Sequence, residues 1–304
     1  ATVLAGQMFG IPVSGTMAHS WVMYYKDEYE AFRHYAENYP DNTVLLVDTY
    51  DTIKSGIPNA IRVAREVLEP MGKRLKGIRI DSGDLAYQSI RVRKMLDDAG
   101  LTDCKIIVSN SLDEHTISSL NMQKARIDGY GVGERLITGA SSDYSEDSIS
   151  LLGAVYKIAA VEENGGFAPR IKVSGSVEKI TNPGLKKVYR VYDQNGKAKA
   201  DLIAKADETI DMSQEFRFVD PDMPWRNLKF THCTVRPLQE KIFENGKLVY
   251  KLPTLNEIRA YVKKQLDEEI WEEEQRFVNP HKHYMDMTPD YYDMKMSLLN
   301  DSRA

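Results

Sequence analysis

The stretch Ile78-Arg79-Ile80-Asp81-Ser82-Gly83-Asp84 joins a short apolar run to a polar cluster that begins where the run ends. Residues 45–51, 106–111 and 127–133 repeat this design. A short apolar run is typical of a strand buried in a parallel sheet, and α/β barrels carry their chemistry at the carboxyl ends of such strands. The stretch therefore predicts a strand whose end faces an active site.

Helix-like sequence fills most of the gaps between these segments. Residues 53–68, 85–99 and 114–124 carry apolar side chains three or four positions apart. The alternation predicts an α/β fold in which helices cover a parallel sheet. No Gly-x-Gly-x-x-Gly turn follows the first strand, so a closed or distorted barrel fits the pattern better than an open dinucleotide-binding sheet.

The chain has 304 residues, which is enough for more than one structural unit. We expect residues 1–160 to form the βα barrel portion with the catalytic rim. Residues 161–250 contain short alternating segments and hairpin turn signals, which predict an antiparallel β-rich unit. Residues 251–304 are expected to be a helix and a tail, because a capping-box pattern starts an acidic amphipathic helix predicted over residues 254–277.

Composition excludes several classes of partner. The formal net charge of −5 gives no support to a nucleic-acid partner or an anionic membrane surface. No apolar run approaches the ~20 residues that a membrane-spanning helix needs. The two cysteines, Cys104 and Cys233, are far apart and lack metal-type spacing. We therefore expect a cytoplasmic protein in a reducing compartment.

The segment Gly15-Thr16-Met17-Ala18-His19-Ser20 places a histidine beside small and hydroxyl residues. A histidine at a strand-to-helix turn can be a general base, a metal ligand or a phosphate acceptor. The alternative is a hydrogen-bonded structural imidazole. No second histidine follows three or four positions later, so a His-His metal site is not expected.

Two carboxylate pairs have the same spacing, Asp48 with Asp51 and Asp81 with Asp84. Carboxylates with small neighbours suit Mg²⁺, which is usually held by one or two carboxylates together with substrate phosphates. The alternative, which applies most strongly to Asp51 and Asp84, is that these side chains only cap the following helices. Arg79 shares a strand face with Asp81 and can bind a carboxylate or phosphate.

The run Gly131-Val132-Gly133-Glu134-Arg135 ends the fourth predicted strand. Two glycines let the backbone approach a ligand closely, and free N–H groups there can bind an anion. Ordinary turns use the same residues, so this signal is weak by itself.

The ordered motifs GTMAHS, LLVDTYDT, IRIDSGDL, IIVSNSLDE and IDGYGVGERLITG resemble the C-terminal two-thirds of nicotinate phosphoribosyltransferases of the bacterial type. The resemblance extends to SGSVEKITNPGLKKVYRVYD and covers essentially the whole chain. It implies a type II phosphoribosyltransferase-like distorted α/β barrel with an added antiparallel β unit and a C-terminal helix. The implied enzyme is a ligase or glycosyltransferase of NAD salvage, which makes nicotinate mononucleotide and pyrophosphate from nicotinate and phosphoribosyl pyrophosphate.

The resemblance also implies roles for individual residues. ATP, as co-substrate, would phosphorylate His19, while Asp48 and Asp81 would serve in catalysis and hold Mg²⁺. The residues implied in substrate binding are Thr16, Ser20, Arg79, Ser109, Asn110, Gly131, Gly133 and Glu134. Relatives often carry Thr at position 134, so a carboxylate there would have to point away and leave only its N–H for a phosphate.

The resemblance further implies a homodimer whose contacts to the nicotinate ring lie before residue 1. It leaves open whether the chain is active alone and whether it selects the acid over the amide. The alternatives are a nicotinamide or quinolinate phosphoribosyltransferase, or a non-catalytic phosphate-binding barrel fragment. The quinolinate enzyme needs no ATP, so the GTMAHS segment argues against it, and ATP-dependent labelling of His19 separates an enzyme from a passive module.

Overall fold

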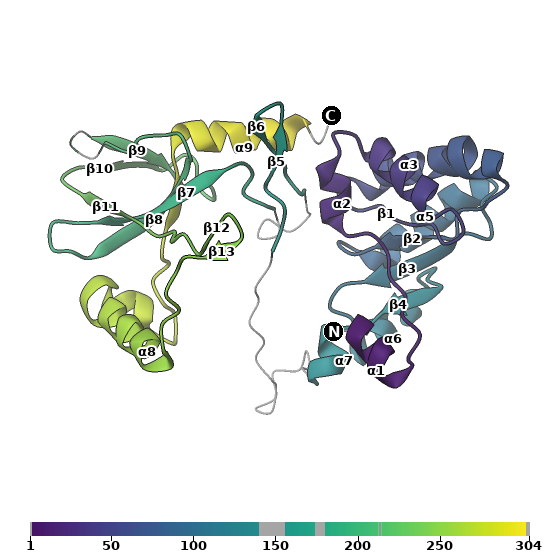
Figure 1. The fold of residues 1–304 in the computed structure, drawn as a ribbon, viewed down its shortest axis with the longest axis horizontal. Helices are drawn as coiled ribbons and strands as arrows, with labels where there is room; N and C mark the ends of the chain where they lie inside the picture. Colours follow the sequence, from purple (N-terminus) through teal and green to yellow (C-terminus); the bar gives the residue numbers. More distant parts are fainter. Residues whose placement is uncertain (1, 140–155, 174–179, 212, 214, 302–304) are drawn as a thin grey trace. The chain divides into compact units, whose positions relative to one another are not determined.

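The computed structural model describes residues 2–139, 156–173, 180–211, 213 and 215–301. The chain divides into two units, one within residues 1–183 and the other over Gly184–Asp301. In Figure 1 the first unit is coloured from purple to teal and the second from teal to yellow. The three-part division at residues 160 and 250 stays a prediction.

The first unit is built on a four-stranded parallel sheet whose spatial order, β1-β2-β3-β4, is the order of the sequence (Figure 1). The strands are β1 Val44–Leu46, β2 Gly77–Ile80, β3 Lys105–Ser109 and β4 Gly129–Gly131. A mixed α/β fold with a parallel sheet is therefore confirmed.

Helical segments precede, connect and follow these strands. They are α1 Thr2–Phe9, α2 His19–Tyr24, α3 Glu28–Asn38, η1 Thr52–Gly56, α4 Ile57–Val63, η2 Ala64–Leu68, η3 Glu69–Met71, α5 Leu85–Asp98, α6 Glu114–Met122 and α7 Glu134–Thr138. The predicted helix over residues 53–68 is thus a run of π-helical and α-helical pieces.

The core of this unit lies between the sheet and its helices. Leu45, Ile78 and Ile106 are neighbours across the strands and are fully buried. Phe32 of α3 and Leu96 of α5 belong to the same hydrophobic cluster. Burying these side chains fixes the helices on the sheet and so fixes the loops that follow the strands.

One close approach ties η1 to the end of β1. A Cβ atom added to Gly56 would lie 1.9 Å from the carbonyl oxygen of Val47. Only glycine allows the two backbones to come so close. The last residue of η1 therefore packs directly against the residue that follows β1.

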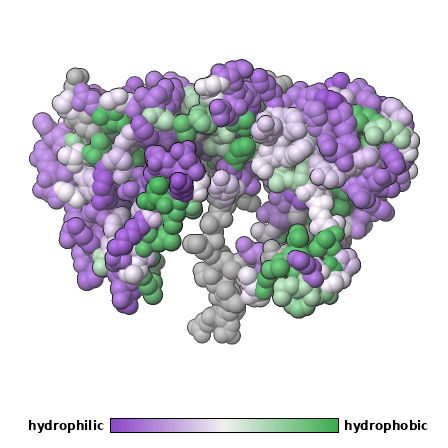
Figure 2. All heavy atoms as spheres, viewed as in Figure 1, coloured by the Kyte–Doolittle hydropathy of each residue, from purple (hydrophilic) through white to green (hydrophobic). Residues whose placement is uncertain are grey.

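The hydrophobic surface is uneven across the unit. Helix α1 exposes Val3, Leu4, Met8 and Phe9, and hydrophobic atoms gather at this helix in Figure 2. The core cluster therefore does not extend to α1. A hairpin, β5 Ala160–Glu163 with β6 Gly166–Pro169, completes the described part of this unit.

The second unit contains a six-stranded sheet with the order β10-β9-β14-β8-β7-β11. The strands are β7 Lys186–Tyr192, β8 Ala198–Lys205, β9 Phe216–Val219, β10 Asn227–Phe230, β11 Thr234–Pro237 and β14 Met285–Met287. All neighbours are antiparallel except β14 and β8, which are parallel. A small hairpin pairs β12 Phe243–Glu244 with β13 Lys247–Leu248.

The C-terminal region differs from the sequence prediction. Thr254 caps α8 Leu255–Lys264 through the expected capping box, and the helix continues as η5 Gln265–Glu269. It ends there and not near residue 277, because Ile270 is extended and the next segment is the short 3₁₀ helix η6 Glu272–Gln275. The predicted tail contains β14 and a helix, α9 Pro289–Asp301.

Among the described residues, none of the helices combines the length and the apolar character needed to cross a membrane.

Candidate active site

His19 is the first residue of α2 and is buried, with 5% of its surface exposed. Its Nδ1 lies 3.1 Å from the hydroxyl oxygen of Thr49, a residue in the loop after β1. Its Nε2 lies 3.4 Å from Asp81 Oδ2 and 3.9 Å from Asp48 Oδ1, within ion-pair range when the ring is protonated, and has no hydrogen-bond partner among the described residues. The imidazole is therefore fixed at one nitrogen and faces two carboxylates with the other.

Asp48 joins the loops after β1 and β2. Its Oδ2 accepts hydrogen bonds from the Asp81 backbone N–H at 2.9 Å and from the Ser82 hydroxyl at 2.6 Å. Its Oδ1 is buried and has no hydrogen-bond partner among the described residues. One oxygen of this buried carboxylate thus joins the two loops, and the other faces His19 Nε2 without a hydrogen bond.

The second member of each carboxylate pair has the structural role that the sequence left open. Asp51 accepts hydrogen bonds from the backbone of Ile53 and Lys54 at the start of η1. Asp84 accepts one from the backbone N–H of Tyr87 in α5. The capping alternative is confirmed for both residues. Each loop therefore uses its outer aspartate to start a helix and directs its inner aspartate to the site.

The neighbours of Asp81 determine its charge state. Burial raises its pKa, but the His19 ring, the Ser109 hydroxyl and the positive charge of Arg79 together lower the pKa to about 2. The Ser109 hydroxyl donates a hydrogen bond to Asp81 Oδ1. Asp81 is consequently ionised at neutral pH, and its negative charge lies next to His19 Nε2.

Arg79 provides the positive charge of the rim. Its Nη1 donates a hydrogen bond of 2.5 Å to the hydroxyl of Thr16, which lies in the segment before α2. Its Nε is buried and lacks a hydrogen-bond partner among the described residues. The guanidinium is thus anchored on one side and has an unused donor on another.

The end of β3 has an unusual backbone. Asn110 and Ser111 have φ angles of 92° and 50°, which non-glycine residues seldom adopt. Such conformations persist where the surrounding structure enforces them, and they gather at functional sites. Gly131 pairs with Ser109 across the sheet, and a Cβ atom at Gly131 would lie 3.2 Å from the Ser109 Cβ.

The structure brings together most, but not all, of the residues expected at the site. The residues that form one connected set are Thr16, His19, Asp48, Arg79, Asp81 and Ser109. Ser20, Gly133 and Glu134 are exposed, and in the described part of the chain no hydrogen bond joins the side chain of Ser20 or Glu134 to this set. Their roles, like those of the other site residues, remain predictions.

Two side chains that the sequence did not single out complete the hydrogen bonding. Thr49 contacts His19 Nδ1, and Ser82 donates to Asp48. Each follows a predicted site aspartate directly in the sequence, and that adjacency was the available signal.

The rim offers two carboxylates to a cation. Within the described ranges, no group of three or more His, Cys, Asp or Glu side chains is arranged to hold a metal ion. A cation at Asp48 and Asp81 would therefore depend on waters or on a ligand for its remaining contacts.

Similarity to known proteins extends along the whole chain. Residues 185–295 match the family model of the nicotinate phosphoribosyltransferase C-terminal domain. The chain is 46% identical to a nicotinate phosphoribosyltransferase of Bacillus subtilis, over 100% of this chain and 60% of the relative. It is 33% identical to one of Dictyostelium discoideum, over 99% of this chain and 58% of the relative.

A crystal structure of human nicotinic acid phosphoribosyltransferase is 26% identical and covers 99% of this chain and 64% of that one, with a TM-score of 0.40. The curated relatives confirm the resemblance that the motifs indicate. The chain spans about 60% of the length of the first of them.

Proposed function

We propose that this chain, a homologue of nicotinate phosphoribosyltransferases, carries the phosphohistidine centre of such an enzyme. The enzyme would make nicotinate mononucleotide and pyrophosphate from nicotinate and phosphoribosyl pyrophosphate, with ATP hydrolysis, in NAD salvage. One observation carries the proposal: His19 Nε2, Asp48 Oδ1 and Arg79 Nε are buried without hydrogen-bond partners among the described residues. Buried polar atoms normally have partners, so this rim is suited to a ligand that bears both donors and anionic groups.

The imidazole geometry supports phosphorylation at Nε2. When Nδ1–H donates to the Thr49 hydroxyl, the ring lone pair lies on Nε2. Nε2 would attack the γ-phosphorus of ATP, so that an N–P bond forms while the P–O bond to the departing ADP breaks. Water later cleaves the N–P bond and releases phosphate. Thr49 would keep the nucleophilic nitrogen turned toward the rim in each cycle.

The carboxylates suit the transfer at the sugar. The nicotinate nitrogen forms a bond to C1 of the ribose while the bond from C1 to pyrophosphate breaks, and the sugar gains positive charge. Asp48 and the ionised Asp81 would stabilise that charge, and Arg79 would bind the departing pyrophosphate. Ser109 and Asn110 would contact the ribose and its phosphate.

The two carboxylates also fit Mg²⁺. Asp48 Oδ1 has no hydrogen-bond partner in the described structure, and Asp81 is ionised, so both can serve as oxygen ligands. When bound, Mg²⁺ would neutralise the charge of the phosphate groups. This chain's own residues would still position the sugar and the imidazole.

The proposal includes a more specific fold and assembly. Four parallel strands in sequential order are compatible with part of a distorted α/β barrel. Thr16 and Ser20 would contact substrate near the phosphohistidine, and the backbone N–H groups of Gly131, Gly133 and Glu134 would hold the 5′-phosphate. The enzyme would be a cytoplasmic homodimer.

The experiment incubates the protein with Mg²⁺, γ-labelled ATP, nicotinate and phosphoribosyl pyrophosphate. It measures acid-labile label on His19 and nicotinate mononucleotide. His19→Ala should lose all label and all stimulation by ATP, whereas His115→Ala, at an exposed histidine of α6, should keep both.

Each outcome separates the proposal from its alternatives. Retention of full ATP-stimulated synthesis by His19→Ala would exclude the phosphohistidine mechanism. Product formation from quinolinate without ATP would favour the quinolinate enzyme, and faster turnover of nicotinamide would favour the amide-using relative. A longer protein, extended by the region that the relatives possess outside the match, should be assayed in parallel. The absence of label and product in both forms would favour the passive module.

A further inference from the structure

The second unit contains a buried carboxylate with no hydrogen-bond partner in the described structure. Asp286 lies in the middle of β14 and is 1% exposed, and both of its carboxylate oxygens lack partners. Asp220, directly after β9, is 2% exposed. Its Oδ1 accepts hydrogen bonds from the backbone of Asp222 and Met223, while its Oδ2 has none. Burial, and then the charge of Asp220, raise the pKa of Asp286 to about 6.

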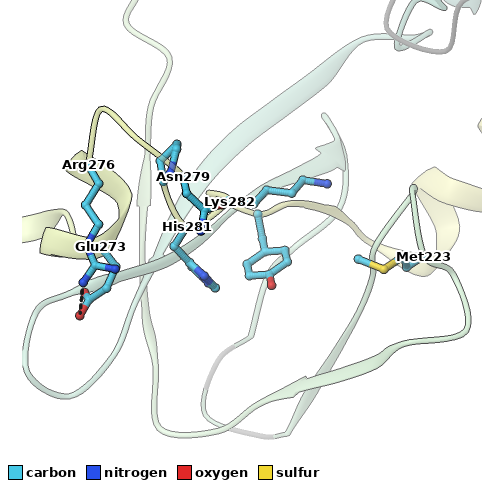
Figure 3. Close-up of a pocket in the computed structure, with 8 residues that line it drawn as sticks. Met223, Glu273, Arg276, Asn279, His281 and Lys282 are labelled. Atoms are coloured by element: carbon cyan, nitrogen blue, oxygen red, sulfur yellow. Dashed lines mark ion pairs between the residues drawn. The ribbon is translucent and has the colours of Figure 1, made fainter.

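Asp286 borders a cavity of about 580 Å³. Three aromatic side chains, Phe230, Trp271 and Tyr284, line it, and we call it the aromatic pocket. The other lining residues are Lys199, Lys229, Glu273, Glu274 and His281. Figure 3 shows an adjoining depression, in which Glu273 of η6 pairs with Arg276 and His281 projects from the following loop.

The nearby cations are engaged elsewhere. Lys229 pairs with Glu215 at 2.6 Å, and Lys282 pairs with Asp222. Arg226 lies over the Tyr284 ring, 5.4 Å from its centre, and reaches Asp220 Oδ2 only at 4.0 Å.

Two further groups could compete for Asp286. Lys199 lies over the Phe230 ring, 5.6 Å from its centre, and His283 faces Asp201 and Glu274. Neither forms an ion pair or hydrogen bond with Asp286 in the described structure. The charges of Lys282, Arg226 and His283 act on Asp286 only from a distance, and they offset only part of the rise in its pKa.

We propose that the aromatic pocket binds an organic cation, an ammonium or guanidinium group, with Asp286 as its counter-ion. Aromatic faces attract cations, and a carboxylate that lines such a pocket accepts hydrogen bonds from their N–H groups or balances their charge. A cavity of this volume lies within the range of small-molecule sites. The same chemistry could come from a free amine or from an Arg or Lys side chain of another polypeptide segment.

The test titrates the 304-residue chain with choline and, separately, with free arginine, and isothermal titration calorimetry measures the binding. The controls are the uncharged carbon isostere of choline and inorganic phosphate. Binding of at least one cation should saturate, and Asp286→Asn should weaken it by at least about tenfold. Asp290→Asn, at an exposed aspartate of α9, should leave it unchanged. Lys199→Gln should leave the affinity equal or increase it, because it removes a positive charge from the rim.

Trp271→Leu provides a second variant at a partly exposed position, and it should also weaken cation binding. Saturation by the free cation in this chain and in a longer protein would indicate a small-molecule ligand. Saturation in this chain alone would indicate that a basic side chain of the longer protein fills the pocket. The proposal fails if neither cation binds, if the uncharged isostere binds as tightly, or if phosphate binds in place of the cations. It also fails if both pocket variants keep wild-type affinity.

Discussion

A buried glutamate in the first unit gives the sharpest prediction about stability. Glu28 begins α3 and is 5% exposed. Its Oε2 accepts hydrogen bonds from the Ser55 hydroxyl and from Asn59 Nδ2, the latter at 3.1 Å. Its Oε1 is buried without a hydrogen-bond partner in the described structure. The site therefore favours the uncharged form of this side chain, and we expect Glu28→Gln to stabilise the unit at alkaline pH.

The size of the effect follows from the pKa. Burial, only partly offset by the bonds from Ser55 and Asn59, raises the pKa of Glu28 from 4.5 to about 7. One pKa unit corresponds to about 1.36 kcal/mol, so the difference amounts to about 3 kcal/mol. Because the pKa is raised in the folded state, this contribution to stability is fully present below pH 4.5 and is lost as the pH rises through 7. Glu28→Gln removes that loss.

The assay is urea unfolding at half-unit steps from pH 5 to pH 8, with Trp225 and Trp271 replaced by phenylalanine in every sample. Trp21 then reports on the first unit, since its indole N–H donates to the Ala31 carbonyl of α3 at 2.8 Å. Wild type should lose stability relative to Glu28→Gln as the pH rises. Glu114→Gln, at an exposed glutamate, should follow wild type. Parallel profiles for wild type and Glu28→Gln would refute the reasoning.

Three further predictions concern other parts of the chain. Gly56→Ala should destabilise the first unit by at least ~3 kcal/mol in urea unfolding, because the new Cβ would lie 1.9 Å from the Val47 carbonyl oxygen. A loss below about 1 kcal/mol would show that the contact between η1 and the residue after β1 relaxes easily. Asp286→Asn should stabilise the second unit above pH 6 by up to about 3 kcal/mol. The reason is that the raised pKa of Asp286 makes the wild-type protein lose stability as the pH rises from about 4 through 6. Equal melting temperatures of the two proteins at pH 8 would contradict this. Thr49→Val should slow ATP-dependent labelling of His19 by about tenfold or more, because the Thr49 hydroxyl orients the imidazole ring. Thr49→Ser keeps the hydroxyl and should label at the wild-type rate. An unchanged labelling rate in Thr49→Val would exclude that role.

Local signals in the sequence predicted the fold where they alone determine the backbone. Asp113, directly before the helix predicted over residues 114–124, caps α6, because its carboxylate reaches the Thr116 N–H within one turn. Asn164 and Gly165 form the turn between β5 and β6 with φ angles of 51° and 79°. The Asn245-Gly246 turn behaves in the same way. These features need no partner far away in the chain, so the local sequence is enough to predict them.

The sequence-based prediction failed where contacts between residues far apart in the chain determine the backbone. The amphipathic pattern beyond Glu269 favours a continued helix, but the Trp271 indole donates to the Ala198 carbonyl of β8, and Gln275 Nε2 donates to the Leu266 and Ile270 carbonyls. The Gln275 side chain satisfies two carbonyls at the end of the broken helix, and the Trp271 bond anchors the next segment on β8. Local periodicity cannot reveal that anchor.

The candidate site shows the same limit. The two aspartate pairs were visible in the sequence, but their spacing is identical. Only the folded loops distinguish Asp48 and Asp81, which face His19, from Asp51 and Asp84, which cap helices. Asp286 was invisible for a further reason, because a three-residue strand is too short to show a periodic pattern.

The central place of β14 has a consequence for how the protein is made. Because β14 lies between β8 and β9, the ribosome releases five strands of this sheet before the strand that joins them. Until residues 285–287 emerge, the edges of β8 and β9 that they cover have unpaired backbone groups, and such edges invite pairing with other chains. The second unit can therefore close only after residues 285–287 have been synthesised. A chain interrupted before residue 285 would present two open sheet edges and depend on chaperones to stay dispersed.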